Sequence, residues 1–333
     1  MAIIKTVQER LNGTAISAGG SRLPVFILKL LVSAGLIFFF IWQTDFSILF
    51  TAFQQTRVGF LAIGLVLYPL GQIICAIKWQ YLARAMGIRR ELKPMIGLYF
   101  IGMFFNLFLP TSIGGDITRS LYLNPNAGRV RTSFLSVLVE RGTGVIAMML
   151  LASLTMLSPY GAPLSPWLRF GFPALSLVFF LGVSVFPYLI GHTRTKIREL
   201  VFDDLLIFWQ RPKITGVAVL YSVLFYVILV SIHVCIARAL SLQIPIPYHF
   251  VTVCLGSLAS LLPSFNGIGV RDGAYIFLLE QIGIHRAHGL LFSFLWFLIM
   301  AISSCIGCIV YLMQGLSPDS PDSTESELAH AKR

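Results

Sequence analysis

Charged residues are scarce in this sequence. Only 12% of the 333 residues are charged, whereas 56% are apolar and the mean hydropathy is +0.82. An average soluble domain carries about 25% charged residues, and so few ionisable groups cannot cover the surface of a soluble domain of this size. The composition therefore excludes a soluble protein and predicts a polytopic integral membrane protein.

Acidic residues are scarcer still, with 14 Asp and Glu against 25 Lys and Arg, a net charge of +11. In a membrane protein this excess is typical of cytoplasmic loops rather than of nucleic-acid binding. The five cysteines all lie in apolar runs, where cysteine behaves as a small hydrophobic residue. There is also no phosphate-binding loop and no acidic cluster spaced for a metal, so we expect no cofactor and no metal site.

Six apolar runs are long enough to cross a bilayer, which takes about 20 residues in a helix. They are Leu23–Trp42, Val58–Ile77, Ser133–Leu157, Trp167–Ile190, Ile214–Ile236 and Leu290–Met313. Two further runs, Met95–Leu109 and Phe250–Leu262, are shorter, and a proline follows each. The predicted fold is therefore all-α, with about six full transmembrane helices and two segments too short to cross.

The distribution of charge predicts how the short segments are placed. Lys78–Pro94 and His192–Lys213 are basic and therefore cytoplasmic, whereas Ser158–Pro166 is uncharged and external. Residues 95–132 then begin and end inside, and residues 250–284 begin and end outside, so each is expected to be a re-entrant hairpin. Both termini are expected in the cytoplasm: residues 1–22 as an N-terminal segment, 23–313 as the membrane domain, and 314–333 as a disordered tail.

The two short segments share a sequence pattern. Leu109–Gly114 and Leu262–Gly267 both read L-P-[ST]-x-x-G. Because they are predicted to enter from opposite sides, they form an inverted repeat, and such broken segments mark the substrate site in secondary transporters. The helices that resume near Asp116 and Asp272 direct positive dipole ends into the cavity, which favours an anion such as a lipid phosphate.

Two charged residues, Glu140 and Arg141, lie within the third long run. A charged residue at the centre of a membrane helix costs about 2.5–3.5 kcal/mol on insertion scales, so both should face the protein interior and have partners. The sequence leaves open whether they hold the helices together or contact substrate. The candidate ion pairs are Arg141–Asp116, Glu140–Arg119 and Glu280–Arg271.

The residues in these segments resemble a known family, the flippase-like transmembrane domain of lysylphosphatidylglycerol synthases. The resemblance rests on Asn106–Arg119, Val139–Gly144 and Asn266–Gly273, and the pair Lys78-Trp79 also fits. It extends over about residues 20–313. The family usually has Asp where this chain has Glu140 and Glu where it has Asp272, so the charge is kept and the side chain differs by one methylene.

The resemblance implies a free-standing flippase in a bacterial inner membrane. In bifunctional members, the domain is thought to move an aminoacylated phospholipid between leaflets. This chain ends soon after its last apolar run, so we expect no aminoacyltransferase domain and no synthesis of that lipid. We expect a non-enzymatic protein that moves an anionic phospholipid or an isoprenoid-type lipid and binds no nucleic acid. The candidate substrate-binding residues are Asn106, Pro110, Gly114, Gly115, Asp116, Arg119, Glu140, Arg141, Asn266, Gly267, Gly269, Arg271 and Asp272.

Two other functions remain open. His285 and His288 flank Arg286 in a short external turn and are the candidates for an intramembrane lipid-modifying transferase. Alternatively, the chain anchors or regulates a lipid-synthesis enzyme without transporting anything. Movement of lipid would be passive or would be coupled to a proton carried by Asp116 or Glu140.

Overall fold

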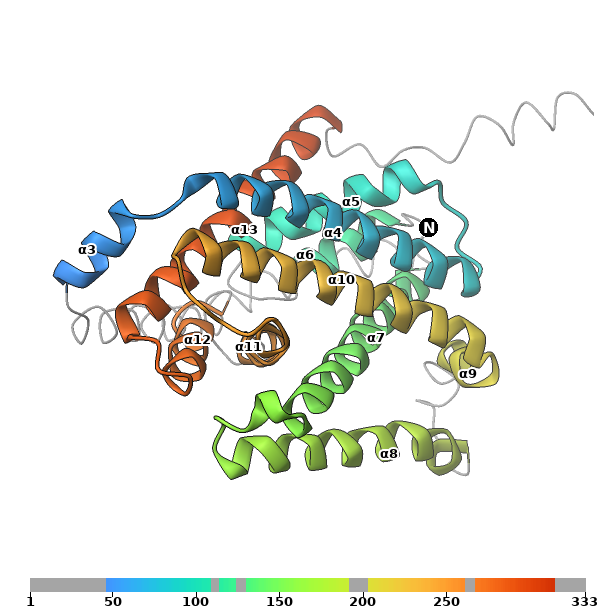
Figure 1. The fold of residues 1–333 in the computed structure, drawn as a ribbon. Helices are drawn as coiled ribbons and strands as arrows, with labels where there is room; N and C mark the ends of the chain where they lie inside the picture. The colour runs from blue at the N-terminus through green and yellow to red at the C-terminus, as the bar shows by residue number, and fades with distance from the viewer. Residues whose placement is uncertain (1–45, 109–113, 124–129, 192–202, 261–266, 315–333) are drawn as a thin grey trace, which may run out of the picture.

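The structure is a computed structural model that describes residues 46–108, 114–123, 130–191, 203–260 and 267–314. Every regular element in these ranges is helical, in agreement with the predicted fold class (Figure 1). The α-helices are α3 (Phe46–Gln54), α4 (Val58–Ala85), α5 (Leu92–Phe108), α6 (Gly114–Leu123), α7 (Val130–Leu157), α8 (Phe172–Gly191), α9 (Asp203–Gln210), α10 (Pro212–Ala239), α11 (Ile246–Ala259), α12 (Val270–Glu280) and α13 (Arg286–Gln314).

Among the described residues, five helices are long and apolar enough to cross a membrane. They are Val58–Ala85, Val130–Leu157, Trp167–Tyr188, Pro212–Ala239 and Arg286–Met313. Each coincides with a run that the sequence analysis identified, so these five predictions are confirmed. The sixth predicted span, Leu23–Trp42, lies outside the described residues, as do the predicted N-terminal segment 1–22 and the tail from residue 315 onward.

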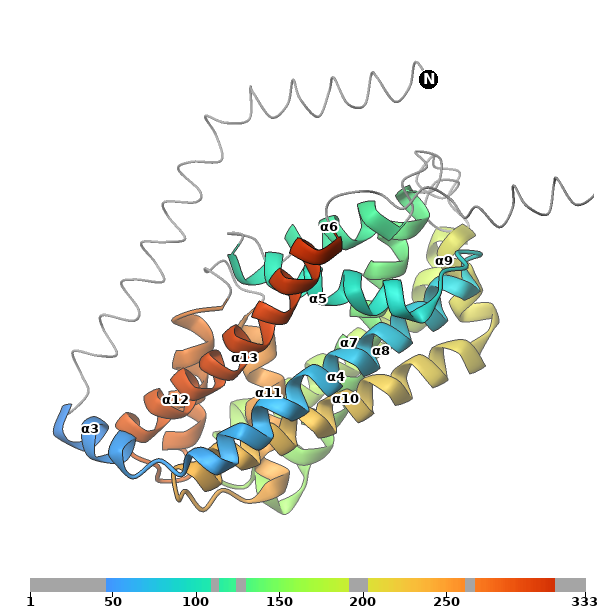
Figure 2. The ribbon, with the colours of Figure 1, turned by 90° about the horizontal axis from the view of Figure 1, so that it is seen from above.

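The two short apolar runs form shorter helices, α5 with 17 residues and α11 with 14. In the chain each is followed by a further short helix that packs against it, α6 against α5 and α12 against α11. The long helix α13 packs against both α5 and α12 (Figure 2). One long helix therefore connects the two short pairs.

The main core is built from residues of α4, α7 and α10 to α13. Within it, α4 and α10 run side by side in both ribbon views (Figures 1 and 2). Small residues bring these helices close together, since a Cβ atom on Gly71 would lie 3.3 Å from the ring of Phe225. Such close approaches are typical of helix packing in membranes, where dispersion contacts replace the hydrophobic effect between helices. The helix α10 starts with Pro212 at its first turn, where the missing N–H costs nothing.

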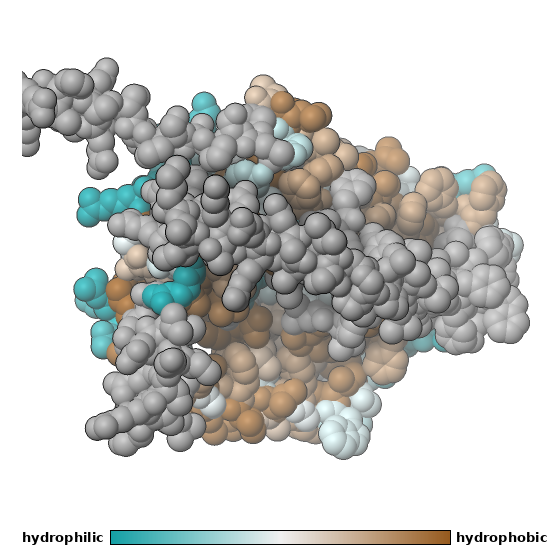
Figure 3. Space-filling view, turned by 180° about the vertical axis from the view of Figure 1, so that it is seen from behind, coloured by the Kyte–Doolittle hydropathy of each residue, from teal (hydrophilic) through white to brown (hydrophobic). Residues whose placement is uncertain are grey.

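Large apolar side chains are widely exposed on the outside of the bundle. Along α8, for example, Leu177, Val178 and Leu181 are all more than half exposed. Brown, hydrophobic side chains also cover much of the face that Figure 3 shows outside the grey atoms. An apolar exterior of this kind is the surface of a protein whose solvent is lipid.

Candidate functional site

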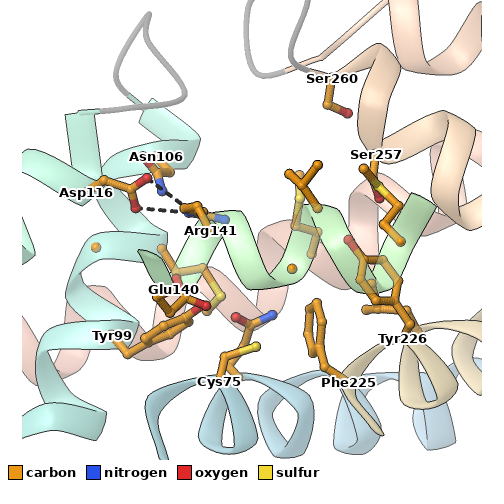
Figure 4. A pocket seen from close by; sticks show the side chains of 18 of the residues that line it. Cys75, Tyr99, Asn106, Asp116, Glu140, Arg141, Phe225, Tyr226, Ser257 and Ser260 are labelled. Atoms are coloured by element: carbon orange, nitrogen blue, oxygen red, sulfur yellow. Dashed lines mark hydrogen bonds and ion pairs between the residues drawn. The ribbon is translucent and has the colours of Figure 1, made fainter. Parts of the chain in front are cut away.

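A cavity of about 490 Å³ lies among the helices. Residues of α4 to α7 and of α10 to α13 line it, so both short helix pairs contribute to its wall. In Figure 4, Asn106, Asp116 and Arg141 lie together on one side of the cavity, and Ser257 and Ser260 lie on the other. Of the candidate residues that the structure describes, six line it: Asn106, Asp116, Arg119, Glu140, Arg141 and Arg271.

Glu140 on α7 is buried and bridges two cations. Its Oε1 lies 2.8 Å from Lys78 Nζ on α4, and its Oε2 lies 2.9 Å from Arg119 Nη2 on α6. The Lys78 ammonium also donates to the backbone oxygen of Glu140 and to Ser222 Oγ, each at 3.0 Å. One carboxylate therefore joins α4, α6 and α7.

Asp116, at the start of α6, also bridges two cations, Arg141 and the same Arg119. Its Oδ1 lies 2.9 Å from Arg141 Nη2 and 3.1 Å from Arg119 Nη2, and its Oδ2 accepts from Arg141 Nε at 3.1 Å. The predicted pairs Arg141–Asp116 and Glu140–Arg119 are thus confirmed. We call Lys78, Asp116, Arg119, Glu140 and Arg141 the charge network; with three cations and two carboxylates, it carries a net charge of +1.

The Arg119 side chain is only 2% exposed. Its guanidinium carbon lies 4.9 Å from the ring centroid of Trp79 and 4.6 Å from that of Tyr99. Trp79 is fixed in turn by its Nε1, which donates to Ser136 Oγ at 3.0 Å. Because Arg119 is held by two carboxylates and two aromatic rings, its geometry is that of a structural group.

Arg141 differs from Arg119 in its exposure. Its side chain is 51% exposed and lines the cavity, although it lies well inside a long apolar helix. Asp116 binds the Nε and Nη2 edge of its guanidinium as a fork, and Nη1 lies outside this fork. Arg141 is therefore both oriented by the protein and accessible to a ligand.

Arg271 is a further cation on the cavity wall, and it lies on α12, in the second short helix pair. Its side chain is 5% exposed, and its distance to Asp272, from Nη2 to Oδ1, is 3.7 Å, too long for a hydrogen bond. Among the described residues, its Nε and Nη2 atoms have no hydrogen-bond partner. A buried guanidinium in this state is poorly stabilised unless an anion joins it.

The prediction that the second helix ends at Ile77 and that Lys78 begins a loop is wrong. The helix α4 continues to Ala85. Lys78 lies within this helix and is buried, with 2% of its surface exposed. The apolar run ends at Ile77 only because Lys78 itself interrupts it. The signal that reveals the continuation is the helical spacing of Cys75, Trp79 and Leu82, which are buried on both sides of the lysine.

Three of the candidate glycines have roles in the backbone structure. Gly115 packs directly against the backbone of Gly102 on α5, and its N–H donates to Asn106 Oδ1 at 2.8 Å. Gly267 and Gly269 have φ values of +79° and +84°, a region that residues with a side chain rarely adopt. In the structure these glycines permit close helix packing and the turn into α12, and substrate contact by them remains a prediction.

Three further candidates have other positions. Asp272 caps the start of α12, because its Oδ2 accepts from the N–H of Gly269 at 2.9 Å. Gly114 is the first residue of α6, and its carbonyl accepts from the hydroxyl of Thr118. Pro110 and Asn266 lie outside the described residues.

The predicted pair of Glu280 with Arg271 is wrong. Glu280 Oε1, at the end of α12, lies 2.9 Å from Arg286 Nε at the start of α13, and both side chains are about one-third exposed. Because Arg271 is nine residues earlier on the same helix, roughly two and a half turns separate it from Glu280. The fold does not bridge that separation.

Sequence reasoning missed several polar groups of the cavity wall, among them Gln72, Tyr99 and Ser257. Gln72 was detectable, because an amide in the middle of the run Val58–Ile77 is costly in lipid unless it faces a partner or a cavity. Tyr99 and Ser257 gave no such signal, since tyrosine and serine are common in membrane helices. Within the described ranges, no group of three or more His, Cys, Asp or Glu side chains is arranged to hold a metal ion.

Most of the chain matches a known family in a comparison of its sequence with family models. A family model described as the lysylphosphatidylglycerol synthase TM region matches residues 26–307, which is most of the chain. The matched range contains the charge network, Arg271 and all the candidate residues. No curated protein and no solved structure matches the chain.

Proposed function

This chain belongs to the family of the lysylphosphatidylglycerol synthase transmembrane region, and we propose that it moves a phospholipid between the leaflets of a bacterial inner membrane. The headgroup occupies the cavity, and its phosphate is bound by Arg141 and Arg271. The lipid's acyl chains remain in the bilayer, in contact with the apolar exterior of the bundle. The protein acts as a transporter and not as an enzyme.

One observation carries this proposal: two cations, Arg141 on the long helix α7 and Arg271 on the short helix α12, line the same cavity. Arg141 is half exposed and held by Asp116 on one edge, and Arg271 is buried with no hydrogen-bonded carboxylate among the described residues. Charged groups inside a membrane protein are costly and are typical of a substrate pathway. A phosphodiester is the anionic group that every common phospholipid offers to such cations.

The movement itself requires the cavity to open to each leaflet in turn. We propose that α5–α6 and α11–α12 are re-entrant hairpins related as an inverted repeat, with the first entering from the cytoplasm and the second from outside. Both termini then lie in the cytoplasm. Packing of both pairs against α13 supports this arrangement, because one long helix would transmit the movement of one hairpin to the other.

Reconstitution into liposomes tests the function. The purified protein is placed in vesicles that contain a small fraction of lipid with a fluorescent acyl chain, and a membrane-impermeant quencher reports the lipid exposed outside. We expect the protein to raise the quenchable fraction from about half toward all of the lipid, and Arg141→Ala and Arg271→Gln to lower the rate at least tenfold. If no labelled phospholipid moves in these vesicles, the proposed function is wrong.

A further inference from the structure

A buried histidine lies directly behind the cavity wall. His233, on α10, has 0% of its surface exposed. Its ring centroid lies 4.8 Å from that of Trp296 and 5.3 Å from that of Tyr275, and both of these residues line the cavity. The hydroxyl oxygen of Tyr275 lies 3.4 Å from His233 Nε2. The tyrosine therefore connects the cavity wall with the imidazole.

The other ring nitrogen of His233 is unsatisfied. Among the described residues, His233 Nδ1 has no hydrogen-bond partner, and neither has Nδ1 of the neighbouring His249. The two imidazoles lie 6.4 Å apart, measured between ring centroids, and Phe292 packs against both. A buried polar atom without a partner costs about 1–3 kcal/mol. Packing alone does not account for such a group, since an apolar ring would fill the same space without that cost.

The charges that act on His233 come from α11 and α12. In the described part of the chain they are those of His249 and Arg271, and no carboxylate is among them. An imidazolium at His233 would therefore lie near a second buried cation without a counter-charge, which is unfavourable in a medium of low dielectric constant. The surrounding core is otherwise uncharged and includes Tyr68 of α4, Met148 of α7, Tyr226 of α10, Cys254 of α11, Tyr275 of α12 and Trp296 of α13.

Tyr275 also relates His233 to Arg271. It follows Arg271 by four residues on α12, so the two side chains lie on the same face of this helix, one turn apart. Gly256 of α11 packs against the phenol ring and leaves no room for a Cβ atom there. The carboxylate of Asp272 lies 3.7 Å from the Arg271 guanidinium and does not hydrogen-bond to it. An anion that binds Arg271 would thus supply the missing counter-charge for both groups.

We propose that His233 is a proton-binding site coupled to Arg271, so that the protein takes up one proton when an anion binds in the cavity. The anion neutralises the guanidinium and removes the repulsion that an imidazolium would otherwise meet. The coupling is reciprocal, because a proton on His233 must favour the anion by the same factor. This inference rests on the proposed function, which supplies the anion as a lipid phosphate, and goes beyond it by assigning a coupling ion and its residue.

The two carboxylates that the sequence suggested as proton carriers are less suited to this role. Glu140 is shared by Lys78 and Arg119, and Asp116 is shared by Arg119 and Arg141. A proton on either carboxylate would leave two cations without their counter-charge. His233 has no such partner to lose.

The proton can enter through Tyr275. In the tautomer of His233 that carries its hydrogen on Nδ1, Nε2 is an acceptor that faces the Tyr275 hydroxyl. The phenol passes its hydrogen to Nε2 and receives one from a hydronium ion in the cavity. The tyrosine is unchanged, and the imidazole gains one proton and one positive charge. The reverse steps release the proton.

Nuclear magnetic resonance of the histidines tests the proposal on the full chain in detergent. The protein is isotope-labelled at histidine Cε1, whose chemical shift reports protonation, and is measured at about pH 6.5, near the usual pKa of a histidine. The anionic probe is phosphatidylglycerol, and the control is diacylglycerol, which lacks the phosphate. We expect one histidine to be neutral without lipid or with diacylglycerol and to be protonated with phosphatidylglycerol.

Variants identify the histidine that responds. His233→Gln should remove its signal, whereas His249→Gln and the exposed His285→Gln should each leave it in place. Arg271→Gln retains His233 but removes the cation that couples it to the anion, so its signal should no longer change with phosphatidylglycerol. This variant tests the coupling even if His233→Gln does not fold.

The pH dependence of lipid binding gives an independent measurement. Quenching of tryptophan fluorescence by phosphatidylglycerol with brominated acyl chains reports the affinity between about pH 8 and about pH 5.5, on either side of the usual pKa of histidine. We expect the affinity of the unmodified protein to rise at least about fivefold toward the acidic end, the lower limit of typical couplings. The affinity of His233→Gln should not change over this range.

The inference is overturned if His233 stays neutral while phosphatidylglycerol binds, if it is protonated without lipid, or if a different histidine responds. Equal pH dependence of the unmodified protein and His233→Gln also overturns it. These results are read without any movement of lipid. A protein that takes up the proton but moves no lipid loses only the flippase function, and one that moves lipid with a neutral His233 loses only the coupling. If phosphatidylglycerol does not bind at all, both proposals are wrong.

Discussion

Glu140 and Lys78 form a buried ion pair between two long helices, with 2.8 Å between Oε1 and Nζ and only 3% exposure of either side chain. Ion pairs of this kind are weak evidence for stability as such, because both charges lose their hydration. Removing one of the two charged groups is strongly destabilising, because its partner is left charged and buried. The pair therefore fixes how α4 and α7 meet, while the second carboxylate oxygen of Glu140 binds Arg119.

The first prediction concerns this carboxylate. Glu140→Gln leaves Lys78 and Arg119 without their shared charge, so we expect the free energy of unfolding to fall by about 3–5 kcal/mol. Thermal unfolding of the purified protein in detergent measures the change. Glu280→Gln is the control, because its partner Arg286 is one-third exposed and an ion pair of that kind contributes less than about 1 kcal/mol. Similar losses for the two variants would contradict the structural role of Glu140.

Glu140→Asp provides a finer test. It restores the acid that is usual in the family but shortens the side chain by one methylene. The Oε1 and Oε2 atoms now reach two cations on different helices, at 2.8 and 2.9 Å. We expect Asp to keep one contact and lengthen the other, with a loss of stability smaller than that of Glu140→Gln. Full stability of Glu140→Asp would show that the helices adjust to either length.

The long helices and part of the charge network were predictable from the sequence, for a simple reason. Apolar runs define spans by length, and a charge inside a run such as Arg141 must have a partner. Lys78 was assigned to a loop because it ends its apolar run, and only the buried stripe of Trp79 and Leu82 shows that the helix continues. Sequence periodicity therefore locates a buried lysine better than hydropathy does.

Tertiary geometry decides the remaining features. No spacing rule places Arg119 between Trp79 and Tyr99, because the three residues come from three helices whose mutual packing depends on side-chain contacts. The role of Gly115 is also tertiary. Nothing in the sequence indicates that it packs against the backbone of Gly102, as the structure shows.

The second prediction separates two arginines of the charge network. Arg119→Ala removes a buried cation that two carboxylates share, so we expect a large loss of stability, about 3–5 kcal/mol. Arg141→Ala removes a half-exposed side chain and leaves Asp116 paired with Arg119, so stability should change by less than about 2 kcal/mol while lipid movement falls. Unfolding curves and the liposome assay are measured on the same preparations. Equal destabilisation by the two variants would show that Arg141 is also structural.

The third prediction concerns the contact of α5 with α6. A Cβ atom on Gly115 would overlap the carbonyl of Gly102, so Gly115→Ala must push α6 away from α5 and displace Asp116. We expect a loss of about 1–3 kcal/mol, typical of overpacking. Gly142→Ala on α7 is the control, because nothing lies within 4 Å of the added methyl group. In a helix, that change should be neutral or stabilising, by up to about 1 kcal/mol.

The fourth prediction tests the re-entrant hairpins with cysteine labelling in a cysteine-free background. If α5–α6 is a hairpin from the cytoplasm, exposed positions before α5 and at the start of α7 lie on the same side of the membrane. Single cysteines at Glu91 and Arg131 should then both be protected from an impermeant thiol reagent in intact cells, whereas cysteines at Ile246 and Gly283, on either side of α11–α12, should both be labelled. Permeabilised cells should label all four, which controls for burial. Labelling of only one member of either pair in intact cells would mean that the corresponding short helices cross the membrane, and the inverted repeat would have to be abandoned.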